Sequence, residues 1–250
     1  MKRYASDGLV FYRFASLEAL GLNHGVFTRS GGLSEAPFAS LNLGFTVGDT
    51  PERVAANRDL VAAALGVEAI VSARQVHGAG SLLVEGPRGS AGPERREADI
   101  LLSATPGLGL MIKQADCQAV IVYEPERRAL AVLHCGWRGS VAGAIPEAVA
   151  RLAASFGARP KAMHAGIAPS LGPCCAEFRG WHEQLPAQFA RFLVGGDHID
   201  FWRLSVEQLV ECGLSRENIE VSNICTRCSA EFYSYRREGL TGRFATVCAL

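Results

Sequence analysis

The sequence predicts an α+β fold: a single-domain mixed α/β sandwich over residues 1–250, with strands grouped in a core and helices packed on the outside. Two observations predict it. Four short apolar runs, at 99–103, 108–112, 119–123 and 129–134, follow one another with only turn residues between them. Helical patterns lie before and after this group instead of alternating with the strands, and such grouping is typical of α+β proteins.

The first helix is predicted after Thr50. A capping residue followed by Pro51 is a typical helix start, and Gly66 is a typical end. Its apolar face contains Val54, Leu60, Val61, Ala64 and Leu65. Residues 69–78 then predict a short strand that carries His77, and residues 86–97, rich in Gly, Pro and charge, predict an exposed loop.

A second helix follows the grouped strands. Ile145, Val149, Leu152 and Phe156 are spaced by four, three and four residues, as on one helix face. Residues 161–170 predict another strand, and residues 205–213 a helix that ends at Gly213. The runs at 219–223 and 245–250 predict the last strands.

Charge and hydropathy exclude several classes of protein. Lys plus Arg and Asp plus Glu both number 25, so the chain lacks the strongly basic balance expected of nucleic-acid-binding proteins. Asp7, Arg13 and Glu18 interrupt the first apolar run, which is not typical of a signal peptide. No uncharged apolar segment is long enough to span a membrane. We therefore expect a cytoplasmic protein that binds neither nucleic acid nor membranes.

The eight cysteines are expected to be thiols, metal ligands or nucleophiles, because disulfides are rare in reducing compartments. Cys225 and Cys228, in "CTRC", have the spacing of a zinc knuckle. The available second pair is Cys174 and Cys175, and adjacent cysteines are awkward joint ligands of one tetrahedral ion. We therefore predict partly buried thiols at these positions instead of a structural zinc site.

The strongest candidate site lies in residues 113–139, "KQADCQAVIVYEPERRALAVLHCGWRG". Two apolar runs around a short polar turn predict a β-hairpin, which would bring Cys117 and His134 to one end of a sheet. His77, in "QVHG", also lies where a strand runs into a Gly-containing turn, and functional side chains concentrate at such ends.

Two chemistries fit if these three side chains meet. Two imidazoles and one thiolate make a three-ligand zinc site with an open fourth position, in which zinc lowers the pKa of bound water to about 7. Alternatively, a histidine lowers the pKa of Cys117 and makes it a nucleophile. The third interpretation is that each residue is an isolated polar side chain at a strand end.

Several stretches, in order, resemble the YfiH-like family, also called the laccase-domain or multicopper polyphenol oxidase family. They are "FTRSGGLS", "SLNLGFTVGD", "VAANRDLVAAALG", "QVHG", "EADILLS", "ADCQAVIVY", "AVLHCGWRG", "GIAPSLGPCC" and "SYRREGLTGR". The resemblance covers nearly the whole chain. Two departures stand out: Cys135 in "HCGWRG", where the family has a small residue, and the additional cysteine in "CTRC".

The resemblance implies a YfiH-like fold and one zinc ion held by His77, Cys117 and His134. It also implies phosphorolysis of adenosine, inosine, guanosine and methylthioadenosine, and deamination of adenosine. One copper ion could replace zinc, since imidazole and thiolate suit it. Laccase activity is not expected, because the six histidines include no His-x-His pair from which to build a trinuclear copper centre.

Phosphorolysis requires an anion site beside the metal. Arg29 is the first candidate, because guanidinium suits phosphate and the glycines that follow let backbone N–H groups approach. Arg138 and Lys113 are alternatives. Asp116 is expected to orient a histidine ligand, and Asn42 to bind substrate or to hold a turn.

Two other functions remain open. One is a metal-free thiol hydrolase or deamidase with Cys117 as nucleophile and His134 as base, by analogy with the similar fold of bacterial cytotoxic necrotizing toxins. The other is a factor that edits cell-wall precursors or binds a partner.

Overall fold

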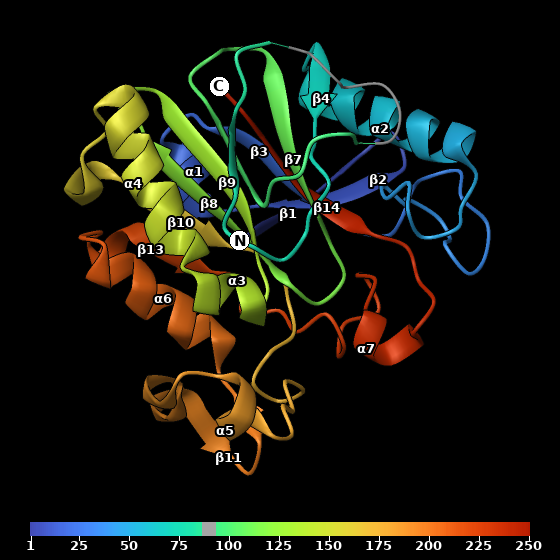
Figure 1. Ribbon diagram of the computed structural model, residues 1–250. Helices are drawn as coiled ribbons and strands as arrows, with labels where there is room; N and C mark the ends of the chain where they lie inside the picture. Colours follow the sequence, from blue (N-terminus) through green and yellow to red (C-terminus); the bar gives the residue numbers. More distant parts are fainter. Residues whose placement is uncertain (87–93) are drawn as a thin grey trace.

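Two six-stranded sheets form the centre of the structure, a computed structural model that describes residues 1–86 and 94–250 (Figure 1). In spatial order, the first sheet contains β1 (Lys2–Ser6), β2 (Leu9–Arg13), β3 (Asn23–Phe27), β14 (Phe244–Ala249), β7 (Leu108–Gln114) and β4 (Ala69–Val71). The second contains β13 (Ile219–Val221), β10 (His164–Ile167), β8 (Gln118–Glu124), β9 (Ala129–Cys135), β6 (Ile100–Ser103) and β5 (Ser81–Leu83). A small pair, β11 (Leu193–Gly195) and β12 (His198–Ile199), lies apart from them. The predicted grouping of strands is confirmed.

The helices lie outside the sheets (Figure 1). They are α1 (Ala15–Ala19), α2 (Pro51–Leu65), α3 (Trp137–Ala142), α4 (Ala144–Phe156), α5 (Trp181–Gln184), α6 (Phe201–Glu211) and α7 (Tyr235–Glu238). The three longer helices confirm the predicted ones at 51–65, 145–156 and 205–213, although α6 begins earlier than predicted.

Three clusters of buried side chains form the hydrophobic core around the two sheets. Between the sheets, Ile112 and Phe244 of the first meet Ile121 and Val132 of the second. On the outer face of the second sheet, strand residues such as Val120 pack against α4 and α6. On the outer face of the first sheet, α2 covers the strands. Because β8 and β9 are covered on both faces, their sequences are continuously apolar instead of alternating.

Helix α2 departs from the prediction in its buried face. It ends at Gly66 in the left-handed conformation, as expected, but Thr50 makes no side-chain cap bond. Leu60 and Ala64 are only partly buried, whereas Asn57 and Arg58 are buried. Asn57 bonds the backbone of the 33–42 loop, at Leu33 N and Asn42 O, so this helix face binds a loop as well as the core.

The predicted hairpin is present. Strands β8 and β9 are antiparallel and pair Ala119 with His134 and Gln118 with Cys135. Cys117 therefore lies immediately beyond the paired residues, at the end of the sheet where His134 is found.

The predicted strand at 69–78 is shorter than expected. Only Ala69–Val71 form β4, and the following residues are irregular up to His77, whose φ is +62°. Local β-propensity is overridden here because the backbone N–H groups of Val76, His77 and Gly78 bond the carboxylate of Asp99 instead of a strand.

Residues 86–97 were predicted to form an exposed loop, and Glu94 contradicts this prediction. Residues 87–93 of that segment lie outside the described part of the chain. The side chain of Glu94 is only 4% exposed and forms ion pairs with Arg58, at 2.7 Å, and Lys113, at 2.6 Å. Burial opposes ionisation, but the two cations outweigh it and lower the pKa of Glu94 to about 2. For Lys113, burial dominates and lowers the pKa to about 8, since one carboxylate is shared with Arg58.

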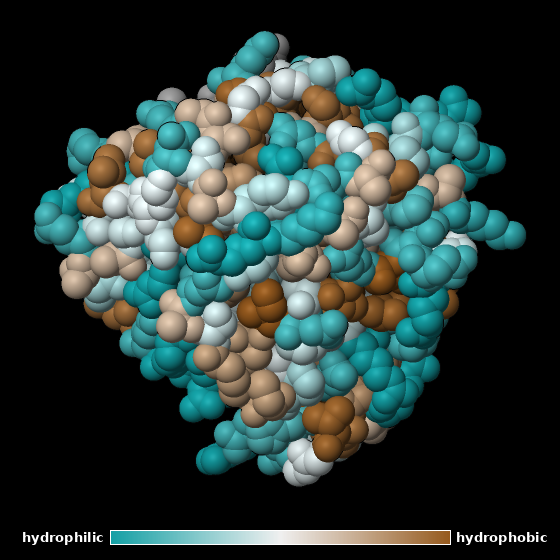
Figure 2. Space-filling view, turned by 180° about the vertical axis from the view of Figure 1, so that it is seen from behind, coloured by the Kyte–Doolittle hydropathy of each residue, from teal (hydrophilic) through white to brown (hydrophobic). Residues whose placement is uncertain are grey.

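The rear surface carries hydrophilic side chains across the whole face, with apolar ones in separate small groups (Figure 2). Such scattered apolar groups are normal on protein surfaces. Among the described helices, none has the length and apolar character needed to cross a bilayer.

Glu94 is expected to be important for stability. Glu94→Gln should lower the free energy of unfolding, measured by urea denaturation, by about 3–5 kcal/mol, because Arg58 and Lys113 would stay buried without a carboxylate. Glu97→Gln is the matched control: Glu97 pairs with Arg74 at the surface, so its loss should cost less than about 1 kcal/mol. Equal effects of the two substitutions would contradict this assignment.

Candidate functional site

The structure brings His77, Cys117 and His134 together, as the hairpin and the strand ends suggested. One donor atom from each lies within 4.8 Å of the others, and the two imidazole rings meet edge to face with centroids 4.7 Å apart. His134 is buried in β9, Cys117 is half-buried just before β8, and His77 is exposed on the loop after β4. Three separate segments therefore supply the group.

Asp99, directly before β6, orients this group. Its Oδ1 accepts from His134 Nδ1 at 2.8 Å and from the backbone of His77 at 3.0 Å, and its Oδ2 accepts from Gly78 N at 2.7 Å. Burial favours the neutral acid, but these donors outweigh it and hold the pKa of Asp99 below its ordinary value. Since Asp99 already bonds Nδ1 of His134, Nε2 is the ring nitrogen that is free to bind a metal ion.

The electrostatics favour a thiolate at Cys117. Burial raises the pKa of this thiol, but hydrogen bonds and charge from His134 and His77 outweigh burial and lower it to about 6. Burial lowers the pKa of His134, yet Asp99 and Cys117 together raise it to about 9. By contrast, burial raises the pKa of Cys135 to about 11, so this neighbouring cysteine is an inert core thiol.

The donor set fits a metal ion. Two imidazoles and one thiolate within ligand distance are a known ligand set for catalytic zinc. The site is tightly packed on the Gly136 side, because a Cβ there would lie 2.8 Å from Cys117 Sγ. Glycine is therefore required beside the thiolate.

The group opens onto a cavity of about 600 Å³. This is within the usual range for small-molecule sites, about 300–1,000 Å³. Its lining combines the three candidate ligands with aromatic and charged side chains. The aromatic ones are Trp137, Phe178, Phe201 and Tyr235, and the charged ones are Arg74, Glu94, Lys113, Asp116, Arg138, Glu177, Arg236 and Arg243.

The basic residues of the cavity differ in how they are paired. Lys113 is paired with Glu94, and Arg74 with Glu97. Among the described residues, no carboxylate pairs with Arg138 or Arg243. Arg138 lies over the Trp137 ring, at 4.3 Å from its centroid, and Arg243 is held by the carbonyls of Thr241 and Gly242.

Five further residues were predicted to contact substrate or orient a ligand, and three of them, Lys113, Asp116 and Arg138, line the cavity. Arg29 and Asn42 do not appear in the lining. The guanidinium of Arg29 lies over the Tyr233 ring and bonds Glu238 at 2.6 Å. Asn42 is fully buried and holds a turn, because its Oδ1 accepts from Gly44 N and Arg243 N.

The prediction that Asp116 orients a histidine is wrong. Its carboxylate accepts from Thr226 Oγ1 at 2.7 Å and from Arg236 N at 2.6 Å. The carboxylate that bonds His134 is that of Asp99, which was not predicted from the sequence, and neither was the place of Arg243 in the cavity lining. Both lie in stretches that carried the family resemblance, "EADILLS" and "SYRREGLTGR", and polar residues in those stretches were the available signal.

Solved structures with the same fold support this description. The chain superimposes on the YfiH protein of Bacillus licheniformis with a TM-score of 0.88 and 29% identity, covering 98% of this chain and 97% of that one. YlmD of Geobacillus stearothermophilus gives a TM-score of 0.87 at 28% identity, with the same coverage. The predicted α+β, YfiH-like fold class is confirmed.

The chain is also similar in sequence to purine nucleoside phosphorylases. A purine nucleoside phosphorylase of Streptomyces coelicolor is 37% identical over 233 residues, 90% of this chain and 94% of the relative. One of Deinococcus radiodurans is 36% identical over 244 residues, 92% of this chain and 90% of the relative. Residues 23–250 match the family described as multi-copper polyphenol oxidoreductase laccase. The match and these relatives show that the chain belongs to this YfiH-like, laccase-domain family.

Proposed function

We propose that this protein is a zinc-dependent purine nucleoside phosphorylase acting on adenosine, inosine, guanosine and methylthioadenosine, with adenosine deaminase activity. The observation that carries the proposal is the His77, Cys117 and His134 group at a cavity whose guanidinium groups include two, of Arg138 and Arg243, with no carboxylate partner in the described part of the chain. The names of the relatives support the same reaction class.

In this proposal, His77, Cys117 and His134 hold the ion, with His134 using Nε2 because Asp99 holds its Nδ1. Bound zinc would supply a Lewis acid and a water of lowered pKa. The role of Asp99 is to fix the imidazole tautomer and ring orientation, and such partners typically change metal affinity or activity about 10- to 100-fold.

The base of the nucleoside has an aromatic surface to bind. The Trp137 and Phe178 rings meet edge to face at 5.2 Å, and the Phe178 and Phe201 rings at 6.3 Å. Stacking a base on an aromatic side chain stabilises binding by about 1–3 kcal/mol. Stacking tolerates different bases because every base has a π-face, so one aromatic surface can bind several purines.

Arg243 and Arg138 are the proposed phosphate ligands. Phosphorolysis forms a bond between a phosphate oxygen and ribose C1, while the bond from C1 to the purine nitrogen breaks and its electron pair leaves with the base. Guanidinium groups bind the phosphate and hold it in line for this displacement. Arg243 is the stronger candidate, because it is half-buried and lines the same cavity as Cys117; burial lowers its pKa, and the charges of Cys117 and Asp116 oppose this shift.

Adenosine deamination uses the same cavity with water in place of phosphate. Water adds at C6 of adenine and ammonia leaves, as in other zinc deaminases. The paired Lys113 and Glu94 line the cavity and are among the polar groups that could bond the base edge.

A nucleoside panel with and without phosphate tests the function. Zinc-loaded protein should release free base from adenosine, inosine and guanosine only when phosphate is present, and should convert adenosine to inosine without it. Chromatography of the products distinguishes the two reactions. No turnover of any nucleoside by zinc-loaded protein would refute the proposal.

Arg243 should control phosphate binding. Arg243→Gln should raise the KM for phosphate about 10- to 100-fold, since a charge-assisted hydrogen bond is worth about 1.5–3 kcal/mol. The KM for nucleoside should change much less. Arg29→Gln is the matched control, because Arg29 is engaged by Glu238, and it should leave the KM for phosphate near the wild-type value. The reverse pattern would return the phosphate role to Arg29.

A metal-free thiol hydrolase or deamidase is the second candidate, and one observation favours it. Cys117, His134 and Asp99 form a continuous chain of nucleophile, base and orienting carboxylate, the arrangement that cysteine hydrolases use.

Substitution of Cys117 separates the two candidates. Under the zinc proposal, Cys117→Asp keeps a charged ligand and should retain weakened zinc binding at this site and some activity, whereas Cys117→Ala should lose the ion of this site and turnover together. Under the thiol mechanism both variants should be inactive. Iodoacetamide gives an independent measurement: zinc should protect Cys117 until a chelator removes the ion. Fast alkylation of the zinc-loaded protein, with inactive Cys117→Asp that still binds zinc, would favour the thiol enzyme.

A further inference from the structure

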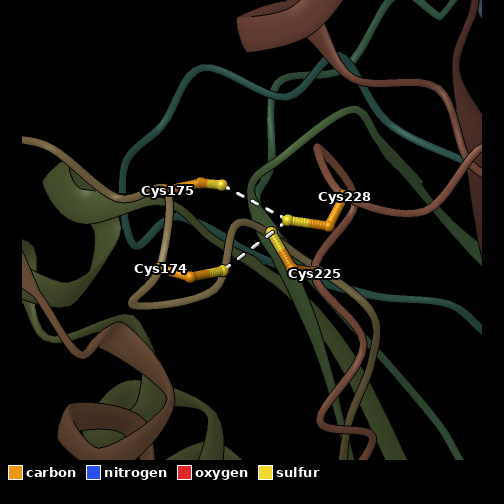
Figure 3. A group of neighbouring side chains, drawn as sticks. All are labelled: Cys174, Cys175, Cys225 and Cys228. Atoms are coloured by element: carbon orange, nitrogen blue, oxygen red, sulfur yellow. Dashed lines mark hydrogen bonds between the residues drawn. The ribbon is translucent and has the colours of Figure 1, made fainter.

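A second group of potential metal ligands lies outside the proposed active site. Cys174 and Cys175 come from the turn after β10, and Cys225 and Cys228 from the turn after β13. Their four sulfur atoms all lie within 4.8 Å of one another, and the four side chains point inward from two facing loops (Figure 3). We propose that these four cysteines bind a second, structural zinc ion.

The spacing of the sulfur atoms fits a tetrahedral site. A zinc–sulfur bond is about 2.3 Å, so neighbouring sulfurs of a tetrahedral zinc site lie about 3.8 Å apart. Cys174 and Cys228 sulfurs are 3.8 Å apart, and Cys175 and Cys228 sulfurs 3.5 Å apart. A disulfide requires about 2.05 Å, so these pairs have the spacing of joint ligands and not of a covalent bond.

The objection that adjacent cysteines cannot share one ion does not hold for this turn. Gly172 O accepts from the backbone N–H of both Cys175 and Ala176, and this tight turn directs both Cys174 and Cys175 toward the facing loop (Figure 3). Gly172 is required there, because a Cβ would lie 2.8 Å from Trp202 and 3.0 Å from Cys225. Partly buried thiols were predicted here because Cys174 and Cys175 are adjacent, and the convergence of the two loops is not visible in the sequence.

The surroundings stabilise negative sulfur. Gly172 N–H donates to Cys225 Sγ at 3.3 Å, and the guanidinium of Arg227 donates to Cys175 Sγ at 3.5 Å. Four thiolates exceed the charge of a divalent cation, so a guanidinium beside them offsets part of the excess. Four soft thiolates in a closed set are a structural ligand set for zinc.

The ion would fix one wall of the cavity. Thr226, between Cys225 and Cys228, donates to Asp116 Oδ1, and the N–H of Leu171, which precedes Cys174, donates to Asp116 O at 2.8 Å. Ala176 and Glu177, directly after the cysteine pair, line the cavity. A metal that joins the two loops would therefore hold the cavity wall in place next to Cys117 without contacting substrate.

Metal analysis of the protein purified without chelators tests the proposal. Zinc-replete wild type should contain two zinc ions per chain, and the double variant Cys174→Ser, Cys228→Ser should contain one. Cys117→Ala should also lose one, from the other site, so the two losses are independent. Cys212→Ser is the matched control, because Cys212 belongs to neither group, and it should keep both ions.

X-ray absorption at the zinc edge of wild-type protein keeps the proposal testable if the double variant does not fold. Both sites filled would give an average of about 2.5 sulfur ligands per zinc, whereas the His77, Cys117 and His134 site alone would give about one. An average near one, an unchanged zinc content in the double variant, or a disulfide among the four cysteines by mass spectrometry would each overturn the proposal. None of these outcomes depends on nucleoside turnover, so they are distinguishable from failure of the proposed function.

Discussion

The geometry of the candidate site depends on the buried carboxylate of Asp99. It accepts from the backbone of Val76, His77 and Gly78 and from the imidazole of His134, and so joins the loop after β4 to β9. An unpaired buried carboxylate would be very costly, so these donors must stay in place as long as the group is charged. They also account for His77 at φ +62°, a conformation that a non-glycine residue keeps only when its surroundings determine it.

Elements formed by residues that are close in sequence could be predicted. The β8–β9 hairpin could be predicted because its apolar runs and turn are neighbours in sequence, and its register places Cys117 and His134 at one end. Asp99 and Arg29 could not be ranked from the sequence, because their side chains contact residues far away in the chain. Asp99 bonds a histidine 35 residues away, and Arg29 pairs with a glutamate 209 residues away. From the sequence alone, Arg29 in "TRSGG" cannot be distinguished, as a candidate anion ligand, from any other arginine beside glycines.

Asp116 connects the candidate active site to the four-cysteine group. Its φ is +90°, and its carboxylate accepts from Thr226 and from the backbone of Arg236. Because Cys117 follows directly, any movement of the loops that carry the cysteines would be passed to the thiolate through one peptide unit. The Arg236 guanidinium adds a second link, since it bonds the carbonyl of Glu177 at 3.2 Å. The shape of the cavity and the position of the proposed metal ligand Cys117 are thus set by the same contacts.

The donor sets also limit the chemistry, whatever the family is called. Only two of the six histidines enter the three-residue group; His24, for example, is fully buried elsewhere and accepts from Phe14 N at 2.8 Å. One His2Cys set can hold a single ion, whereas reduction of oxygen to water by a laccase needs several coppers close together. Zinc in such a set has no redox chemistry and acts as an electrophile or activates water. Beside a cavity with guanidinium groups and aromatic rings, those two actions of the proposed zinc ion would suit the proposed displacement at a sugar carbon and hydrolysis at a purine ring.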